Sequence, residues 1–342
     1  MMSTKSTAAS RSSPPSVTPS SNARRATSGS GMSPGTPATC RAARRRDFTM
    51  RHPSTVPTFT ITPSGPFDLR AAAGFGFGPR AGAETPAEAR MELAFCLDAL
   101  DGHAGVTLVQ DADGVVHGEI EGTDELDAVR RQVARVLSLD GDGIAFAAIG
   151  ERDPVLGELQ AQQPGRRPVL FHSPYEAAVW GIISARRSPA QGAVVRQALA
   201  ERLGRVLTAG AAFPTPRRLL AAEPLPGLPE VKVQRLHALA RAALDGELDQ
   251  PTLLALDPAD AAERLQRLPG IGPFYAMLVL VRGTGHHDLP PADEPRTLAA
   301  ARHFYGPDRA FAEIAEAWRP YRTWGSVLLH SAGRRAGIEP ER

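Results

Sequence analysis

The sequence predicts an α+β N-terminal subdomain, a mainly α-helical domain after it, and a disordered basic tail before both. Three observations predict this. Residues 1–55 almost lack large apolar side chains, residues 56–155 carry short apolar segments punctuated by Gly and Asp, and beyond about residue 155 apolar residues recur at helical spacing. A chain of 342 residues with 42% hydrophobic content is long enough for two packed units. We therefore expect domains at 1–55, 56–155 and 156–342.

The first segment, residues 1–55, is rich in Ser, Thr, Pro, Ala and Arg. Residues 1–46 carry eight basic and no acidic side chains, so the remainder, +2 less +8, has a charge of −6. Such a segment cannot bury enough surface to offset its ordering entropy, so we expect disorder. Three interpretations stay open: a solvated tail, a chain that truly starts at Met50, or an organellar transit peptide, although an amphipathic pattern is lacking.

Composition excludes several classes of protein. No stretch of 18 apolar residues occurs, so we expect no membrane partner. Two distant cysteines, Cys40 and Cys96, cannot form a disulfide framework or a four-thiolate metal or iron–sulfur site, and they fit a reducing compartment. The overall charge gives no support for a nucleic-acid partner, which would need a local basic patch.

The second segment predicts a small antiparallel sheet with one helix. Short strands are expected at 58–62 (TFTIT), 91–99 (MELAFCLDA), 105–112 (GVTLVQDA) and 114–122 (GVVHGEIEG). Residues 123–140 follow with Leu126, Val129, Val133 and Val136 at helical spacing, behind Thr123 as the candidate cap. The helix would cover one face of the sheet.

After about residue 155 strand signals vanish, so the last domain is expected to be all-α with short connections. Helices are predicted at 174–187, 189–203, 215–222, 230–245, 257–267, 273–282, 294–304, 309–317 and 322–336.

The most informative turn joins two of these helices, with the sequence Leu268-Pro269-Gly270-Ile271-Gly272. The glycines permit a positive φ and close approach of another backbone, and the proline that follows suits the first position of a helix. Amides at the positive end of a helix bind anions such as a nucleic-acid phosphate. We expect the turn to hold a phosphate and the apolar helix behind it to be core.

These residues resemble the hairpin of the helix–hairpin–helix (HhH-GPD) DNA glycosylase superfamily. Segment 213–248 and the "WRPYRTW" helix within 315–330 are similar to the 3-methyladenine DNA glycosylase II branch, and the resemblance covers about residues 57–335. It implies that the hairpin grips the DNA backbone through main-chain amides, often with a bound monovalent cation. No other cofactor and no catalytic metal is implied.

The resemblance also implies a catalytic aspartate in a P-x-D loop after the hairpin. Pro291-Ala292-Asp293 occupies that place, so Asp293 is the expected catalytic group, and Glu294 is the alternative if the loop is shifted by one residue. A carboxylate there would stabilise oxocarbenium character at C1′ or activate water. Either acid could instead cap the next helix. Members that also cut the strand carry a lysine where this chain has Phe274, which implies a monofunctional enzyme.

The predicted base pocket consists of Phe274, Tyr275 and His330, in which the two aromatic rings would stack on an alkylated base or belong to the core. The sequence departs from the branch in three places. Ala185 and Arg186 stand where the branch has a glutamine and an apolar wedge that fills the gap left by the flipped base, and we expect the flat guanidinium of Arg186 to serve as the wedge. His330 replaces a tryptophan, and Glu294 replaces a pocket tyrosine. These departures weaken the prediction of the lesion.

We therefore expect a monomeric, cytoplasmic and nucleoid-associated DNA glycosylase that excises 3-methyladenine-type purines from damaged duplex DNA. The alternatives are a catalytically silent helix–hairpin–helix DNA-binding protein and a bifunctional oxidised-base glycosylase. His286, His287 and Asp288 suggest a metal only weakly, because adjacent histidines rarely converge on one ion. Phosphate contacts are expected collectively from Arg186, Arg187, Arg217, Arg218, Lys232, Arg235, Arg319 and Arg322.

Overall fold

A computed structural model describes residues 56–80, 83–290 and 294–340. All of them lie in the unit formed by residues 54–342. The predicted tail, 1–55, lies outside the described residues. The predicted boundary near residue 155 stays a prediction.

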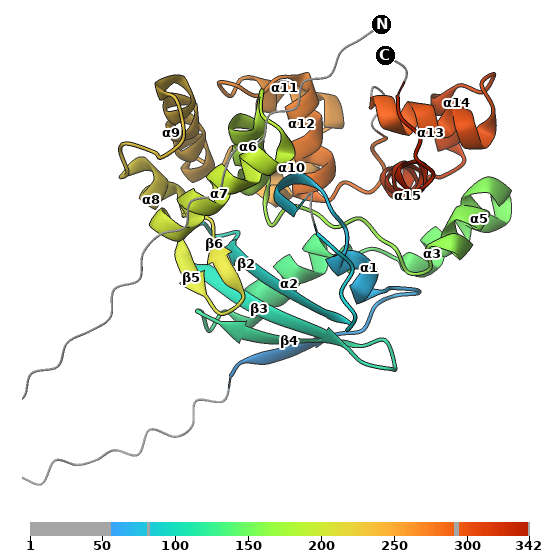
Figure 1. The fold of residues 1–342 in the computed structure, drawn as a ribbon, viewed down its shortest axis with the longest axis horizontal. Coiled ribbons are helices and arrows are strands. Elements are labelled where there is room, and N and C mark those ends of the chain that lie inside the picture. Colours follow the sequence, from blue (N-terminus) through green and yellow to red (C-terminus); the bar gives the residue numbers. More distant parts are fainter. Residues whose placement is uncertain (1–55, 81–82, 291–293, 341–342) are drawn as a thin grey trace, which may run out of the picture. The chain divides into compact units, whose positions relative to one another are not determined.

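The N-terminal part contains the predicted antiparallel sheet, with strand order β1-β4-β3-β2 (Figure 1). Its strands are β1 (Thr58–Ile61), β2 (Arg90–Cys96), β3 (His103–Gln110) and β4 (Val116–Glu121). In β4 the exposed and buried residues alternate strictly, as expected for a sheet with one covered face. The fold class is confirmed here.

Helix α2 (Leu126–Val136) packs against the sheet, because Val129, Val133 and Val136 are buried in the same core as the strands. The predicted cap is wrong: Glu125 is the N-cap residue, and Thr123, three residues before the helix, accepts the Glu125 N–H with its hydroxyl. Thr123 therefore closes the turn before the helix.

The rest of the described chain is mainly helical. Early helices are α1 (Leu69–Ala73), the 3₁₀ turn η1 (Gly78–Arg80), α3 (Gly143–Ala147), α4 (Ile149–Arg152) and α5 (Pro154–Gln162). Then follow α6 (Pro174–Ser184), α7 (Pro189–Leu203), α8 (Pro216–Leu220), α9 (Glu230–Leu244), α10 (Gln250–Ala255), α11 (Pro258–Gln266) and α12 (Pro273–Val279). The last are the π-helical turn η2 (Leu280–Thr284), α13 (Pro295–Tyr305), α14 (Phe311–Glu316) and α15 (Arg322–Arg335).

The expected absence of strands after residue 155 is wrong. Strands β5 (Arg205–Leu207) and β6 (Gly210–Ala212) form an antiparallel pair. They follow α7, and Leu207 and Ala212 pack on Ala94 of β2. This small hairpin joins the helical part to the sheet.

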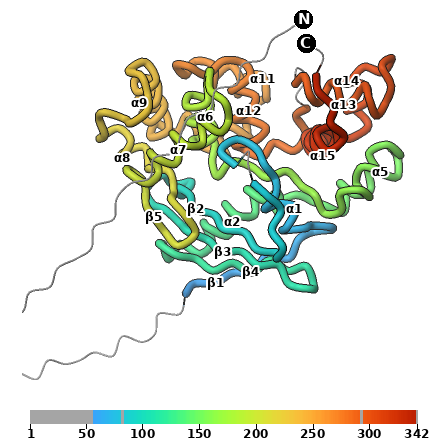
Figure 2. The backbone as a smooth tube through the Cα atoms, in the orientation of Figure 1, coloured from blue at the N-terminus to red at the C-terminus, as the bar shows by residue number. Residues whose placement is uncertain are grey.

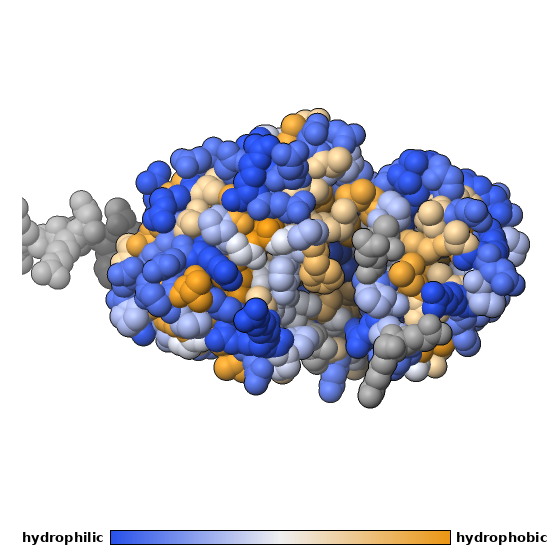
Figure 3. Space-filling view, turned by 90° about the horizontal axis from the view of Figure 1, so that it is seen from above, coloured by the Kyte–Doolittle hydropathy of each residue, from blue (hydrophilic) through white to orange (hydrophobic). Residues whose placement is uncertain are grey.

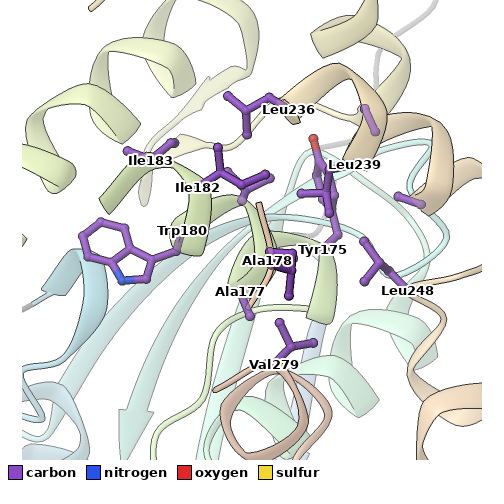
Figure 4. Packing of buried hydrophobic residues seen from close by; sticks show 14 of the residues in the cluster. Tyr175, Ala177, Ala178, Trp180, Ile182, Ile183, Leu236, Leu239, Leu248 and Val279 are labelled. Carbon is purple, nitrogen blue, oxygen red and sulfur yellow. The ribbon is translucent and has the colours of Figure 1, made fainter. Parts of the chain in front are cut away.

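Helix α6 is the centre of the largest core (Figure 4). Every residue from Pro174 to Ile183 is buried, so the helix is enclosed on all sides. Ile182 shares this core with Leu236 of α9, and Val279 of α12 lies below Ala177 in the close-up (Figure 4). Helix α12, which follows the predicted hairpin, therefore packs on α6.

A second helical core gathers α13, α14 and α15 around Trp318 and Trp324, together with residues of α3, α4 and α5. The chain then returns from α5 to α6 between the end of α2 and η2 (Figure 2). There the Leu170 N–H donates to Val136 O and the Phe171 N–H to Arg282 O, both at 2.8 Å. Among the described helices, none is long and apolar enough to cross a membrane.

Candidate active site and nucleic-acid interface

The predicted hairpin is present as α11, a turn of residues 267–272 that we call the hairpin turn, and α12. Gly270 has φ +93°, which an L-amino acid rarely adopts, and its neighbour Ile271 is buried in the α6 core. Gly272 is the N-cap residue of α12, with Pro273 at the first helical position. Burial of Ile271 therefore fixes the turn while its glycines stay at the surface.

The hairpin turn leaves backbone amides available to an anion. Within the described residues, the N–H groups of Gly270 and Gly272 donate to no acceptor, whereas the Ile271 N–H is used by Leu268 O at 3.1 Å. A Cβ atom at Gly272 would meet nothing within 4 Å, so another molecule can approach the backbone there. This is the geometry expected of a phosphate-binding helix N-terminus.

The two aromatic residues after the turn lie differently. Phe274 is 63% exposed, so at this position the predicted core helix is wrong; the apolar run is also split, since α12 ends at Val279 and η2 follows. Tyr275 is half-buried, and its ring lies over Gly181 of α6. The rings of the pair meet edge to face at 5.3 Å. Phe274 is the one that an incoming base can reach.

A second turn lies at the C-terminal end of α6, at residues 185–187, and we call it the α6–α7 turn. Arg186 is exposed and has φ +59°, a strained value for a residue that is not glycine. Lys232 of α9 donates to Ile183 O at 2.9 Å and to Ala185 O at 2.8 Å, and Arg187 donates to Ile183 O at 3.1 Å. These cations bind the carbonyls that the end of the helix leaves free.

The chain leaves α12 through η2, a single π-helical turn of the kind often found at functional sites. Its Arg282 guanidinium lies 3.9 Å from the Phe77 ring centroid and 5.1 Å from that of Phe75, and burial lowers its pKa to about 9. Gly285, at φ +85°, then turns the chain towards the loop that carries the predicted P-x-D motif. The exit from the hairpin is thus held by packing.

Pro291, Ala292 and Asp293 lie outside the described residues, but both flanks of this triplet are anchored. Before it, the Leu289 N–H donates to the Thr323 hydroxyl at 2.9 Å, and that hydroxyl donates to Leu289 O at 2.8 Å. After it, Glu294 caps α13 by accepting the Thr297 N–H at 2.6 Å and the Thr297 hydroxyl at 2.7 Å. Leu289 and Glu294 are therefore held in place by hydrogen bonds.

Glu294 is the N-cap of α13, as one of the interpretations of this acid pair allowed. His330 of α15 lies 3.1 Å from the same carboxylate oxygen. Burial alone would raise the pKa of Glu294, but the hydrogen bonds from His330 and Thr297 hold it at about 2. With its Oε2 engaged in this way, the carboxylate is suited to hold structure in place.

The His286–Asp288 loop is also held by ion pairs. Asp288 accepts from Arg319 at 2.7 Å and from the Arg322 Nε at 2.8 Å, while His287 stacks on Tyr321. No group of three or more His, Cys, Asp or Glu side chains within the described ranges is placed to hold a metal. A pocket of about 240 Å³ lies along this loop, lined by Asp140, Gln250, Leu254 and residues 284–288.

The predicted site residues fall into two groups. Helix contacts bring together the hairpin turn, Phe274, Tyr275 and the α6–α7 turn with Arg186, since the Ser184 hydroxyl lies 3.4 Å from the Tyr275 hydroxyl. Glu294 and His330 form the other group, and no hydrogen bond among the described residues joins it to the first. Seen from above, this side of the molecule is largely hydrophilic, with separate apolar patches (Figure 3).

Sequence reasoning missed the contacts that hold these turns. Lys232 was expected to contact phosphate, yet its ammonium group is used by two carbonyls of α6. Arg319 and Arg322 are paired with Asp288 in the same way. The sequence alone does not distinguish a basic residue that is free to bind phosphate from one that is used by carbonyls or carboxylates of the same chain.

Known proteins resemble this chain in sequence and in fold. The chain is 33% identical over 183 residues to DNA-3-methyladenine glycosylase 2 of Escherichia coli (strain K12), over 51% of this chain and 62% of that relative. The solved 3-methyladenine DNA-glycosylase from Archaeoglobus fulgidus superposes with a TM-score of 0.65 at 21% identity, over 82% of this chain and 100% of that one. No protein-family model matches.

A second solved structure, the 8-oxoguanine glycosylase/lyase of Clostridium acetobutylicum in complex with double-stranded DNA, has a TM-score of 0.53 at 19% identity. It covers 69% of this chain and 86% of that one. These solved structures show the fold of this chain, a small sheet with a helical part. In sequence the chain is similar to DNA-3-methyladenine glycosylase 2, and in fold it is similar to solved DNA glycosylases. The resemblance inferred from the sequence is confirmed.

Proposed function

We propose that the protein is a monofunctional DNA glycosylase of base excision repair. It binds damaged duplex DNA as a monomer, flips an alkylated purine of the 3-methyladenine type out of the helix, and hydrolyses its N-glycosidic bond. The observation that carries the proposal is the hairpin turn, whose free amides at Gly270 and Gly272 stand at the N-terminus of α12. The chain spans 62% of the length of the curated relative that it matches, so the activity of that whole protein is a proposal for this chain.

The reaction needs few groups. The bond between C1′ and the base nitrogen breaks, the base leaves with the electron pair, and water adds to C1′ and loses a proton. Asp293 would stabilise the positive charge at C1′ or accept that proton. This role is proposed from the place of Asp293 in the P-x-D motif after the hairpin.

The side chain at position 274 supports hydrolysis without strand cutting. A lyase reaction needs an amine that forms a Schiff base with the sugar, and Phe274 has none. Its exposed ring is available to stack on an electron-poor alkylated base. We propose no organic cofactor and no catalytic metal; a monovalent cation at the hairpin is the one ion proposed.

A catalytically silent DNA-binding protein is the second candidate. It is favoured by His330, which is engaged with Glu294 where the branch has a pocket tryptophan. Both candidates bind DNA through the hairpin, so binding alone does not separate them. We propose a cytoplasmic, nucleoid-associated location for either.

The deciding experiment is single-turnover base release from duplexes that carry 3-methyladenine, 7-methylguanine or hypoxanthine. If the protein is the proposed enzyme, Asp293→Asn abolishes base release and Glu294→Gln retains it. Glu294→Gln should lower the free energy of unfolding by about 1 kcal/mol, because it weakens the cap of α13. Binding of every duplex with no release of any base by the native protein supports the silent candidate. Adducts trapped by borohydride would overturn the monofunctional assignment.

A further inference from the structure

The α6–α7 turn is closed by a hydrogen bond from the Arg187 N–H to Ser184 O at 2.9 Å, and this closure alone does not account for the strained conformation of Arg186. Arg186 is exposed and lies in the left-handed region at φ +59°, which costs about 1 kcal/mol or more for a residue with a β-carbon. Such a conformation persists only where surrounding contacts impose it. The contacts come chiefly from α9.

Lys232 supplies those contacts. Its ammonium group donates to Ile183 O and Ala185 O, the carbonyls just before Arg186, at 2.9 and 2.8 Å. Arg187, just after Arg186, donates to Ile183 O and to Gly227 O, at 3.1 and 2.7 Å. The strained residue is therefore held from both sides by cations bound to main-chain oxygens.

The same helix also touches the hairpin turn. Arg235 lies one helical turn from Lys232, and a Cβ atom at Gly270 would come within 2.7 Å of the Arg235 Cδ. A second link runs from Ser184, at the end of α6, to Tyr275 of α12. The two turns are thus connected through α9 and through α12.

Three other cations lie near Lys232, and their repulsion opposes its position in the protein without DNA. Burial and the neighbouring Arg187, Arg235 and Arg186 lower the pKa of Lys232. None of these four side chains forms an ion pair with a carboxylate in the part of the chain that the structure describes. Cations gathered without acids are stabilised when a polyanion such as a DNA backbone approaches.

We propose that α9 couples the two turns, with Lys232 as the positioning residue that holds Arg186 in the geometry that enters the DNA base stack. This rests on the proposed function and on the sequence-based expectation that Arg186 fills the gap left by the flipped base. Lys232 itself acts on the turn through the carbonyls of α6. Its loss would let the turn relax and would impair base flipping more than bond hydrolysis.

The test compares Lys232→Met with Arg241→Met, which removes one positive charge from an exposed position of the same helix. Excision is measured in single turnover on a lesion paired in a duplex and on the same lesion in single-stranded DNA, which needs no flipping. Lys232→Met should slow the paired substrate about tenfold and the single strand less than about threefold. Arg241→Met should change neither rate by more than about twofold.

A double-mutant cycle with Arg186→Ala tests the route of the effect. If Lys232 acts through Arg186, Lys232→Met adds nothing to Arg186→Ala on the paired substrate. Equal losses on both substrates, or additive losses in the double variant, would overturn the proposal. If thermal melting shows that Lys232→Met is unfolded, Lys232→Gln takes its place, because its side-chain amide keeps a hydrogen-bond donor group.

Fluorescence of 2-aminopurine opposite an abasic analogue reports flipping without chemistry. The native protein and Arg241→Met should raise the signal, and Lys232→Met should not, at protein concentrations that saturate binding. If no variant releases a base but this difference persists, the glycosylase assignment fails and the positioning role stands. If bases are released and the signals are equal, the positioning role fails alone.

Discussion

The hairpin turn and the α6–α7 turn both use left-handed backbone, and they do so with different residues. Gly270 adopts φ +93° with no side chain, so the backbone itself is presented to an anion. Arg186 adopts φ +59° with a long side chain, so the strain serves to project a guanidinium. The first turn permits close approach to its backbone, and the second projects a long side chain.

The two turns also differ in what holds them. The hairpin turn is fixed from within, by the buried Ile271 and by the N-cap at Gly272. The α6–α7 turn is fixed by side chains that bind the carbonyls of α6, those of Lys232 from α9 and of its own Arg187. A glycine turn needs little support because its conformation costs little, whereas a strained arginine requires a scaffold. Variants in each turn can therefore separate the effect of backbone geometry from the effect of side-chain chemistry.

The largest expected effect comes from the N-terminal end of α6, opposite the α6–α7 turn. Glu176, in the first turn of α6, is buried and accepts from Arg196 at 2.7 Å, from the Cys96 N–H at 3.3 Å, and lies 3.1 Å from His172. Glu176→Gln leaves Arg196 buried without its charge partner, so the free energy of unfolding should fall by about 3 kcal/mol. Urea unfolding at neutral pH measures this loss.

The same carboxylate predicts a pH dependence. Burial alone would raise the pKa of Glu176, but the charges of His172 and Arg196 lower it to about 2, below the ordinary value of 4.5. Its stabilisation is therefore complete above about pH 5 and is lost as the pH falls towards 2. From pH 7 to pH 3 the native protein should lose about 2 kcal/mol more than Glu176→Gln. Equal losses would contradict the ion-pair assignment.

The second prediction breaks the hairpin turn. Gly270→Ala places a Cβ at φ +93° and 2.7 Å from the Arg235 side chain, so unfolding should be easier by about 2 kcal/mol. Gly272→Ala is the matched control, since φ there is −92° and nothing lies within 4 Å. Its stability should change by less than about 1 kcal/mol while DNA affinity falls about tenfold, because the methyl group occupies the approach of the phosphate. Unchanged affinity would remove the phosphate role.

Local signals predicted much of this fold. The Gly-x-Gly turn with its following proline, and the alternation in β4, arise from neighbouring residues and can be seen in the sequence. Helices α5 and α10 were missed although Asp153 and Asp249 cap them, each with a proline in the first turn. The pair β5–β6 gave no pattern, because strands of three residues are too short to alternate.

The site was predictable to a lesser degree. The hairpin turn was found because its glycines report a backbone requirement directly. The strain at Arg186 and the contacts of Lys232 were not, because they depend on α9 packing beside α6, some 46 positions along the chain. Asp293 lies outside the described residues, so its assignment remains the prediction that the family resemblance implies.

A smaller effect, of opposite sign, is expected at the α6–α7 turn. Arg186→Gly removes the side chain and the strain, so stability should rise by about 0.5–1 kcal/mol. Arg186→Ala removes the side chain and keeps the strain, so stability should hardly change. Both should lose flipping to the same extent in the 2-aminopurine assay. A gain in stability with Ala, or none with Gly, would mean that the turn is not strained.

The smallest effect is expected where the two turns meet. Tyr275→Phe removes the 3.4 Å contact with the Ser184 hydroxyl and keeps the ring that lies over Gly181. The Ser184 hydroxyl still donates to Trp180 O at 2.7 Å, so no polar group is left unpaired and the cost should stay below about 0.5 kcal/mol. Ser184→Ala, which loses both bonds, is the matched variant for chemical denaturation. If Tyr275→Phe instead impaired flipping as strongly as Lys232→Met, the coupling between the turns would run through α12 and not through α9.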